Sequence, residues 1–358
     1  MVRFVLMLVM LCVGAAQADR LQIDPKEVHS VWAGNGASCA VFTTGKISCW
    51  GQVVLENEVI HKTPMAIDGL ADIVQVAPSW EICALKSDGT IACWRTGRLR
   101  SKSMGKIAPI TFETLPVKDV VELALGSGSA CARLRDGTVS CWGRNEIGQG
   151  GNGTKKDSVD PVRVPKLTGV LQLVGSSYAS CALLSDHTVT CWGYNYAGAL
   201  GDGTKKTRFV PTKLAKLANV AQIGLGESHG CALANGAVEC WGNNDYGQLG
   251  DGTLKAHLTH APVKGVTDAV ALAVGAGGTC AIDAKSQLWC WGAIAPGLKT
   301  RNTPAKLLDG VASVSLGGDH ACALMKDGGV QCWGGNGDGQ LGDGSEPIHR
   351  DLPGPVKF

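Results

Sequence analysis

The segment Cys131-Ala-Arg-Leu-Arg-Asp-Gly-Thr-Val-Ser-Cys141-Trp142 contains most of what decides the fold of this 358-residue chain. Two cysteines flank a short alternating segment with Asp136-Gly137 near its centre. A three-residue loop with glycine in the left-handed conformation is a common hairpin connection. It places Cys131 opposite Cys141 in a non-hydrogen-bonded pair, where facing Cα atoms lie about 4.5 Å apart. Disulfides accept roughly 4.4 to 6.8 Å, so the segment is predicted to be a disulfide-bridged β-hairpin.

The same pattern occurs seven times, with the second cysteine nine or ten residues after the first and tryptophan directly after the second. The predicted disulfides join Cys39 with Cys49, Cys83 with Cys93, Cys131 with Cys141, Cys181 with Cys191, Cys231 with Cys240, Cys280 with Cys290, and Cys322 with Cys332. The one shorter pair encloses Asn235-Gly236, the preferred two-residue type I′ turn, which keeps its cysteines opposite each other. His187 stands where most copies have glycine, and histidine tolerates the left-handed region better than most residues.

Two features leave alternatives open. The sixth hairpin has Ala284-Lys285-Ser286 without glycine, so its turn signal is the weakest. Buried free thiols could also act as small apolar residues, although the facing register would then be a coincidence. Zinc ligation is disfavoured because the spacing is not the usual short ligand knuckle.

Each hairpin belongs to a larger repeat. An apolar strand such as residues 120–126 precedes it, and a Gly/Asn/Asp loop and a short strand such as residues 161–164 follow it. First cysteines recur at intervals of 42 to 50 residues. Four short strands in each unit of this length are the signature of a propeller blade. We therefore predict an all-β, seven-bladed β-propeller with four short antiparallel strands per blade, with residues 20–23 and 353–358 as candidate outer strands at the ring closure.

The N-terminus predicts the compartment. Residues 1–18 contain Arg3, an apolar stretch over residues 4–13 and the small-x-small sequence Ala16-Gln17-Ala18, which is typical of a secretory signal peptide. Cleavage after Ala18 removes Cys12 and leaves fourteen cysteines, an even set suited to an oxidising compartment. Acylation of Cys12 is a weaker alternative, because the bulky Leu11 precedes it. We expect a secreted or periplasmic protein, without membrane insertion, whose residues 19–358 form a single propeller domain.

The loops after the tryptophans indicate a family. Residues 241–253, Trp-Gly-Asn-Asn-Asp-Tyr-Gly-Gln-Leu-Gly-Asp-Gly-Thr, closely resemble the repeat of the regulator of chromosome condensation, and residues 334–344 and 193–204 repeat it. The resemblance runs from about residue 28 to the C-terminus. It weakens after Trp50, Trp94 and Trp291, where the Gly-Gln-Leu-Gly segment is absent. The paired cysteines are similar to those of bacterial secreted members.

The predicted compartment limits which functions of the family can apply to this chain. The founding member of the family is a nuclear guanine-nucleotide exchange factor that also docks on nucleosomes. A signal peptide separates this chain from a nuclear GTPase. A formal net charge of +2 gives little field to attract nucleic acid, which is not expected as a partner. A secreted propeller protein that inhibits β-lactamase through one face of its ring is the closer analogy in compartment, although fold alone establishes neither activity.

Several segments have the composition of functional sites. Gly334-Gly-Asn-Gly-Asp338 resembles a calcium-binding nonapeptide, but we interpret it as a structural turn in which Asn and Asp cap backbone groups. His229 and His320 each lie two residues before a first cysteine, and a structural role is favoured over metal binding or base catalysis. No serine-histidine-acid set or carboxylate pair can be assembled from the sequence, so no catalytic residue, metal site or cofactor is predicted.

One irregular segment has interaction potential. Residues 95–106 replace the neutral turn of other repeats with five basic residues, which are Arg95, Arg98, Arg100, Lys102 and Lys106. The simplest interpretation is a solvated charged loop. The functional hypothesis is a contact patch for an acidic protein or polysaccharide on the face where the Gly-rich loops gather, widened by Lys155-Lys156 and Lys205-Lys206.

The sequence therefore predicts a monomeric, non-enzymatic binding or scaffold module with an unknown protein or polysaccharide partner. The first alternative is an inhibitor of an extracellular enzyme, which would carry a concave or flat face rich in aromatic residues. A propeller hydrolase or lyase would need a polar cluster at the central channel. An exchange-factor-like activity would require an intracellular location.

Overall fold

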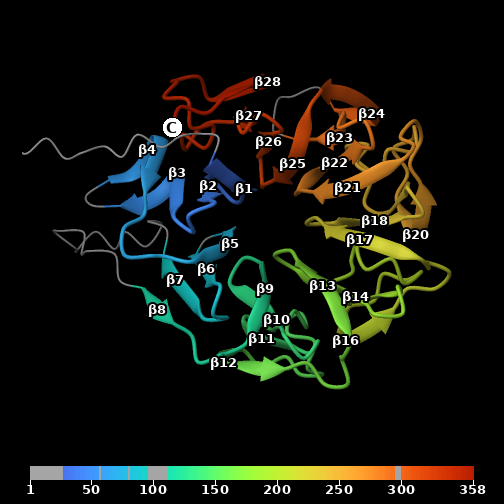
Figure 1. The fold of residues 1–358 in the computed structure, drawn as a ribbon. Coiled ribbons are helices and arrows are strands. Elements are labelled where there is room, and N and C mark those ends of the chain that lie inside the picture. The colour runs from blue at the N-terminus through green and yellow to red at the C-terminus, as the bar shows by residue number, and fades with distance from the viewer. Residues whose placement is uncertain (1–26, 56–57, 80, 96–111, 295–299) are drawn as a thin grey trace, which may run out of the picture.

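The protein is an all-β propeller of seven four-stranded antiparallel sheets arranged around a central axis, as predicted (Figure 1). The computed structural model describes residues 27–55, 58–79, 81–95, 112–294 and 300–358. The predicted signal peptide and residues 20–23 lie outside these ranges. Every sheet consists of four strands that are consecutive in the chain, with the first strand at the channel and the fourth at the rim.

The strands divide into blades as follows. Blade 1 comprises β1 (Val28–Ala33), β2 (Ala37–Phe42), β3 (Ile47–Leu55) and β4 (Glu58–Ala66). Blade 2 comprises β5 (Ile73–Pro78), β6 (Glu81–Lys86), β7 (Ile91–Arg95) and β8 (Glu113–Thr114). Blade 3 comprises β9 (Val120–Leu125), β10 (Ser129–Leu134), β11 (Val139–Gly143) and β12 (Ser158–Arg163). Blade 4 comprises β13 (Val170–Gly175), β14 (Ala179–Leu184), β15 (Val189–Gly193) and β16 (Arg208–Lys213). Blade 5 comprises β17 (Val220–Leu225), β18 (His229–Ala234), β19 (Ala237–Gly242) and β20 (His257–Pro262). Blade 6 comprises β21 (Ala269–Val274), β22 (Gly277–Asp283), β23 (Leu288–Ala293) and β24 (Arg301–Leu308). Blade 7 comprises β25 (Val311–Leu316), β26 (His320–Met325), β27 (Val330–Gly335) and β28 (His349–Pro355).

The central hairpins have the predicted register. Cys131 faces Cys141 across β10 and β11, and the corresponding cysteines face each other in the other six blades. Gly137 has φ +75° and His187 has φ +59°, so both adopt the predicted left-handed conformation. The hairpin with the weakest signal forms as well. Ser286 takes the left-handed position at φ +62°, and the Asp283 carboxylate accepts hydrogen bonds from the backbone N–H of Lys285 and Gln287.

Disulfides join the two cysteines of every central hairpin, in the pairing that the register predicts. The Cα–Cα distances are 4.0–4.1 Å, slightly shorter than the 4.4 Å at the lower end of the usual range. The bridges, in chain order, link Cys39 to Cys49, Cys83 to Cys93, Cys131 to Cys141, Cys181 to Cys191, Cys231 to Cys240, Cys280 to Cys290, and Cys322 to Cys332. All fourteen cysteines are therefore in disulfides, and the structure contains neither free thiols nor zinc ligands at these positions.

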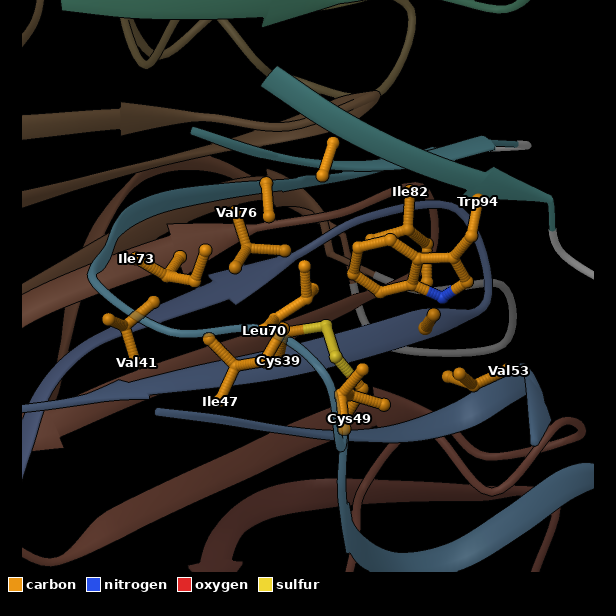
Figure 2. Packing of buried hydrophobic residues seen from close by; sticks show 14 residues of the cluster. Cys39, Val41, Ile47, Cys49, Val53, Leu70, Ile73, Val76, Ile82 and Trp94 are labelled. Atoms are coloured by element: carbon orange, nitrogen blue, oxygen red, sulfur yellow. A yellow bond between two sulfur atoms is a disulfide. The ribbon is translucent and has the colours of Figure 1, made fainter. Parts of the chain in front are cut away.

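Each disulfide shares a buried cluster with the tryptophan of the next blade. Figure 2 shows Cys39 and Cys49 of blade 1 with Trp94 of blade 2. The same pairing recurs at the other six joints. Adjacent residues on a strand point to opposite faces, so cysteine and tryptophan from one hairpin reach two different neighbours.

The ring closes by packing rather than by strand exchange within the described residues. Blade 7 takes its outer strand β28 from residues 349–355, which overlaps the predicted residues 353–358. Trp50 of blade 1 lies in the cluster of the Cys322–Cys332 disulfide of blade 7. Phe358 packs edge-on against Trp50 and Phe42, with ring centroids 5.8 and 5.9 Å apart. First and last blades are thus joined by the same disulfide–tryptophan contact as their neighbours.

Candidate functional site

The propeller has two different faces. In the part of the chain that the structure describes, the loops that join the first to the second strand and the third to the fourth strand of a blade meet at one face, which we call the loop face. Backbone hydrogen bonds link the two kinds of loop, from Arg144 N to Gly128 O, from Tyr194 N to Tyr178 O and from Asn243 N to Ser228 O. The central hairpin turns lie at the opposite face, which we call the turn face.

The family-like loops of blades 3, 4, 5 and 7 are built on a buried asparagine. Asn336 accepts a hydrogen bond from the backbone N–H of Leu341 and donates to the carbonyls of Ser345 and Pro347. Asn145, Asn195 and Asn244 make the equivalent bonds. This agrees with the interpretation of residues 334–338 as a structural turn. Among the described residues, no group of three or more His, Cys, Asp or Glu side chains is arranged to hold a metal ion.

The glycine that ends each of these turns lies against the tryptophan of the next blade. Gly151, Gly201, Gly250 and Gly342 have φ of +61° to +67°, and a Cβ on any of them would lie 2.7 Å from the indole ring. The indole Nε1 donates to a carbonyl of the same turn, as from Trp50 to Gln340 O at 2.9 Å and from Trp241 to Ala199 O at 2.8 Å. The family motif therefore joins neighbouring blades. We call this combination, the glycine packed against the indole and the hydrogen bond from the indole Nε1 to the turn, the inter-blade latch.

The latch is missing at the joint between blades 1 and 2, where the sequence departs from the motif. Blade 1 lacks the Gly-Gln-Leu-Gly segment, and the buried Nε1 of Trp94 in blade 2 has no hydrogen-bond partner among the described residues. Phe112 packs edge-on against this indole instead, with centroids 5.7 Å apart. At this joint the irregular turn thus costs an inter-blade hydrogen bond.

A serine-histidine-acid constellation that we did not predict occurs between blades 7 and 1. His320 Nε2 lies 2.7 Å from Ser38 Oγ, and its Nδ1 lies 3.3 Å from Asp319 Oδ1. The Ser38 side chain is fully buried, and its hydroxyl is also 3.1 Å from the carbonyl oxygen of Gln340. A nucleophile in this position has no access to substrate.

The corresponding joint between blades 5 and 6 explains the constellation. His229 Nε2 lies 2.9 Å from Thr279 Oγ1, which donates to the carbonyl of Gln248. Thr279 and Ser38 each precede a first cysteine, and no acid stands beside His229 in the place of Asp319. Burial lowers the pKa of His229 to about 3, so its ring is neutral at physiological pH. Both histidines link adjacent blades, in agreement with the structural role predicted for them.

The central channel is lined by the first strands of the blades and has a volume of about 440 Å³. Its polar side chains are used in joining the blades. Gln172 forms two hydrogen bonds with the peptide groups of Ile223, and Gln75 and Gln222 do the same with Leu123 and Leu272. Glu122 takes this position in blade 3, accepting hydrogen bonds from Leu173 N and Arg133 Nε. Burial raises the pKa of the Glu122 carboxyl.

An aromatic cluster on the loop face is the most distinctive exposed feature. All four tyrosines of the chain lie on the loop face, in blades 4 and 5, with exposed fractions of 39 to 71%. They are Tyr178, Tyr194, Tyr196 and Tyr246. Tyr194 stacks on Tyr196 with centroids 6.3 Å apart and an interplanar angle of 12°, and Tyr178 lies 6.1 Å from Tyr194. We call Tyr178, Tyr194 and Tyr196 the tyrosine cluster, whereas the ring of Tyr246 lies beside Gly277 of blade 6.

Sequence reasoning missed this cluster, although a signal was present. The tyrosines are confined to residues 178–246 and to repeats that are otherwise regular. Tyr178 and Tyr194 are sixteen residues apart, and only the pairing of the two loop types across β14 and β15 brings their rings together.

The predicted basic patch lies mostly outside the described residues. Arg95 is the last residue of β7, while Arg98, Arg100, Lys102 and Lys106 fall in residues 96–111, which the structure does not describe. Lys155-Lys156 and Lys205-Lys206 are exposed in the loops of blades 3 and 4, and the Lys155 ammonium lies 5.1 Å from the centre of the Phe209 ring.

Two further observations bear on the surroundings of the protein. Seven disulfides are typical of an oxidising, non-cytosolic environment. Over the residues that the structure describes, we find no helix able to cross a membrane.

Comparison with solved structures places the fold. The chain is similar to human WBSCR16, with a TM-score of 0.73 and 21% identity over 84% of this chain and 86% of that chain. It is similar to Prp20p of Saccharomyces cerevisiae, with a TM-score of 0.69 and 20% identity over 81% and 80% of the two chains. The ectodomain of the receptor kinase CR4 of Physcomitrella patens gives a TM-score of 0.55 and 21% identity over 86% and 74%. A search of curated proteins finds no sequence match.

Family models match the repeats directly. Two models described as the regulator of chromosome condensation (RCC1) repeat match the chain, one at residues 120–149 and 311–340 and the other at residues 186–233 and 235–282. These matches cover parts of blades 3, 4, 5 and 7 and extend into the second strand of blade 6. These four segments of the chain are therefore regulator-of-chromosome-condensation repeats.

Proposed function

We propose that this protein is a secreted or periplasmic binding module that holds a partner protein against the loop face, with the tyrosine cluster as the anchor. The observation that carries the proposal is that every tyrosine of the chain is exposed on the loop face, and that three of them lie ring against ring. Tyrosine is enriched at protein interfaces and among the few residues that dominate binding energy. Its ring buries a large area with little conformational freedom to lose, while its hydroxyl remains a hydrogen-bonding group.

The rigidity of the loops on this face supports the proposed binding function. The tyrosine-bearing loops are fixed by Asn195, Asn244 and the latch glycines, so little ordering is left to occur on binding. Preorganised loops lose less entropy when a partner docks. Prp20p, which has a similar fold, has binding properties to Gsp1p and histones. Export after cleavage at Ala18 and a single domain over residues 19–358 are parts of the same proposal.

Inhibition of an extracellular enzyme is a second candidate, because an aromatic-rich face is the feature expected of such an inhibitor. The tyrosine cluster provides that feature. The basic residues Arg95, Arg98, Arg100, Lys102 and Lys106 remain a proposed second contact. A hydrolase has no such support, since Ser38 is buried and the channel glutamines bond to neighbouring strands.

The test is capture of a partner by the oxidised protein from the secreted or periplasmic fraction of its source, followed by binding measurements with the purified partner. Tyr178→Ser combined with Tyr196→Ser should weaken binding at least about tenfold, since each anchor residue contributes on the order of 1–2 kcal/mol. Val270→Ser is the matched control, because Val270 is an apolar residue 60% exposed near the turn face. Equal affinity of the double variant and the control would contradict the proposal.

A further inference from the structure

The channel opens at the loop face through a small mouth. Loops from all seven blades surround a cavity of about 150 Å³, well below the roughly 300–1,000 Å³ of pockets for drug-sized ligands. The polar side chains that line it are Asn35, Ser79, Ser176, Ser177 and Glu227. The space suits a single side chain from a partner rather than a free metabolite.

The frame of the mouth is rigid. A Cβ added to Gly126, Gly226 or Gly317 would lie 2.2–2.3 Å from the carbonyl oxygen of the adjoining blade. Neighbouring loops therefore pack backbone against backbone, and only glycine fits at these contacts. Groups that point into the mouth are held in place before any ligand arrives.

Glu227 is the one charged side chain among the residues that line the mouth. It is partly buried, and Ser177 Oγ donates to its Oε1 at 2.8 Å. No lysine, arginine or histidine of the described chain forms an ion pair with it. Burial raises the pKa of the Glu227 carboxyl, because the partly buried carboxylate loses hydration and no neighbouring cation compensates its charge.

The rim next to the mouth adds more negative charge. Asp319 follows the lining residue Gly318. Burial opposes its ionisation, but hydrogen bonds from His320 and Gln340 outweigh burial and hold the pKa of Asp319 below its ordinary value. Asp338 lies over Gly36, with Oδ2 only 2.9 Å from the position that a Cβ there would take. Arg144 lies over Gly128 in blade 3, so the acidic arc of the rim runs over blades 5, 7 and 1.

The tyrosine cluster begins at the same rim, because Tyr178 directly follows the lining residue Ser177. Aromatic faces attract ammonium and guanidinium groups, by about 0.5–1 kcal/mol at exposed sites and more when water is excluded. The mouth, with its unpaired carboxylate and hydroxyl acceptors, therefore borders the loop that carries Tyr178.

We propose that the mouth is a socket for one basic side chain, lysine or arginine, which the partner protein inserts beside Glu227 while it rests on the tyrosine cluster. This inference depends on the proposed protein-binding function. The cation supplies the counter-charge that Glu227 lacks, and the serine hydroxyls and loop carbonyls accept its remaining N–H groups. An acidic or neutral side chain in the same place would leave Glu227 without compensation.

The first test uses defined probes on the oxidised full protein. Acetylated and amidated peptides Gly-Ser-X-Ser-Gly, with X as lysine, arginine, norleucine or glutamate, are titrated while the backbone NMR signals of the mouth are followed. The lysine and arginine peptides should shift the signals of residues 177 and 227 and bind at least about fivefold more tightly than norleucine. Glu227→Gln should abolish this preference, while Asp136→Asn on the turn face should leave it unchanged.

Glu227→Gln keeps the shape of the side chain and an acceptor for Ser177, so a matching melting temperature will show that the fold is intact. Equal binding of lysine and norleucine peptides, or an unchanged preference in Glu227→Gln, would overturn the socket. If the captured partner requires the tyrosine cluster but not Glu227, the socket is wrong and the binding function stands. If capture is independent of the tyrosines, the proposed function fails, and the socket fails as a partner contact even where the lysine peptide binds.

Discussion

The latch between blades 7 and 1 makes a quantitative prediction about stability. Gly342 has φ +67°, and a Cβ there would lie 2.7 Å from Nε1 of Trp50. Gly310 has nearly the same conformation, φ +71°, but nothing lies within 4 Å of the position that its Cβ would take. Comparing alanine substitutions at Gly310 and Gly342 therefore separates two losses of stability, one from the left-handed backbone conformation and one from displacing the indole.

Gly310→Ala should cost only the left-handed strain, about 1–2 kcal/mol. Gly342→Ala should cost the same strain and also displace the Trp50 indole, breaking its hydrogen bond to Gln340 O. A buried donor left without a partner costs about 1–3 kcal/mol. The total for Gly342→Ala is therefore about 2–5 kcal/mol.

The assay is equilibrium unfolding in guanidinium chloride without reductant, followed by tryptophan fluorescence. A double-mutant cycle adds Trp50→Phe, which removes the indole N–H and reduces the ring. In that background both alanine variants should lose similar stability. If Gly342→Ala and Gly310→Ala were equally destabilising with Trp50 present, the latch would not have the energetic role assigned to it.

Four further outcomes are expected. Intact mass with thiol alkylation should show a chain that starts at Asp19, with no free thiol before reduction and fourteen after it; reactive thiols in the native protein would contradict the oxidising compartment. Ser38→Ala should lower the unfolding midpoint while ester hydrolysis stays at background in both proteins, whereas a Ser38-dependent acyl burst would favour a hydrolase. Burial opposes ionisation of Asp251, but hydrogen bonds from Thr253 and His257 hold the pKa of its carboxyl below 3.8. The stabilisation of the fold by this carboxylate is therefore present above pH 3.8 and is lost as the pH falls through the lower pKa of the folded state. The stability of Asp251→Asn should depend less on pH in acid, and a pH profile equal to that of the unchanged protein would contradict this assignment. Because burial raises the pKa of Glu227, binding of the lysine peptide should weaken on acidification above pH 4.5, and affinity that held steady until lower pH would argue against that carboxylate as the partner of the cation.

Much of the fold was predictable because it rests on local turn chemistry. Asp136-Gly137 and Asn235-Gly236 set the hairpin registers, and each register places two cysteines opposite each other without reference to the rest of the chain. The departures were small. Ser286 adopts a left-handed conformation that its residue type does not announce, because Asp283 holds the turn by hydrogen bonds. The outer strand of blade 3 begins at Ser158 rather than at Pro161, since an exposed edge tolerates proline within it.

The candidate site was much less predictable. The sequence directed attention to the basic residues 95–106, since charge composition is visible without any coordinates. The tyrosine cluster depends on the meeting of loops from β14 and β15, and the mouth depends on contributions from all seven blades. Likewise, Ser38 and His320 are 282 residues apart, so no local pattern could pair them.

Taken by itself, the sequence determined the number of blades, the facing of the cysteines and the family of the repeat, because each depends on contacts within about fifty residues. Only the tertiary structure decided what those residues do. In the folded ring, the last glycine of the family motif packs against the indole of the next blade, and the family histidine forms a hydrogen bond to the next blade. The tertiary structure also placed Glu227 at a mouth without a basic side chain, because ring closure brings loops from all seven repeats to a common centre and none of their lining residues is basic.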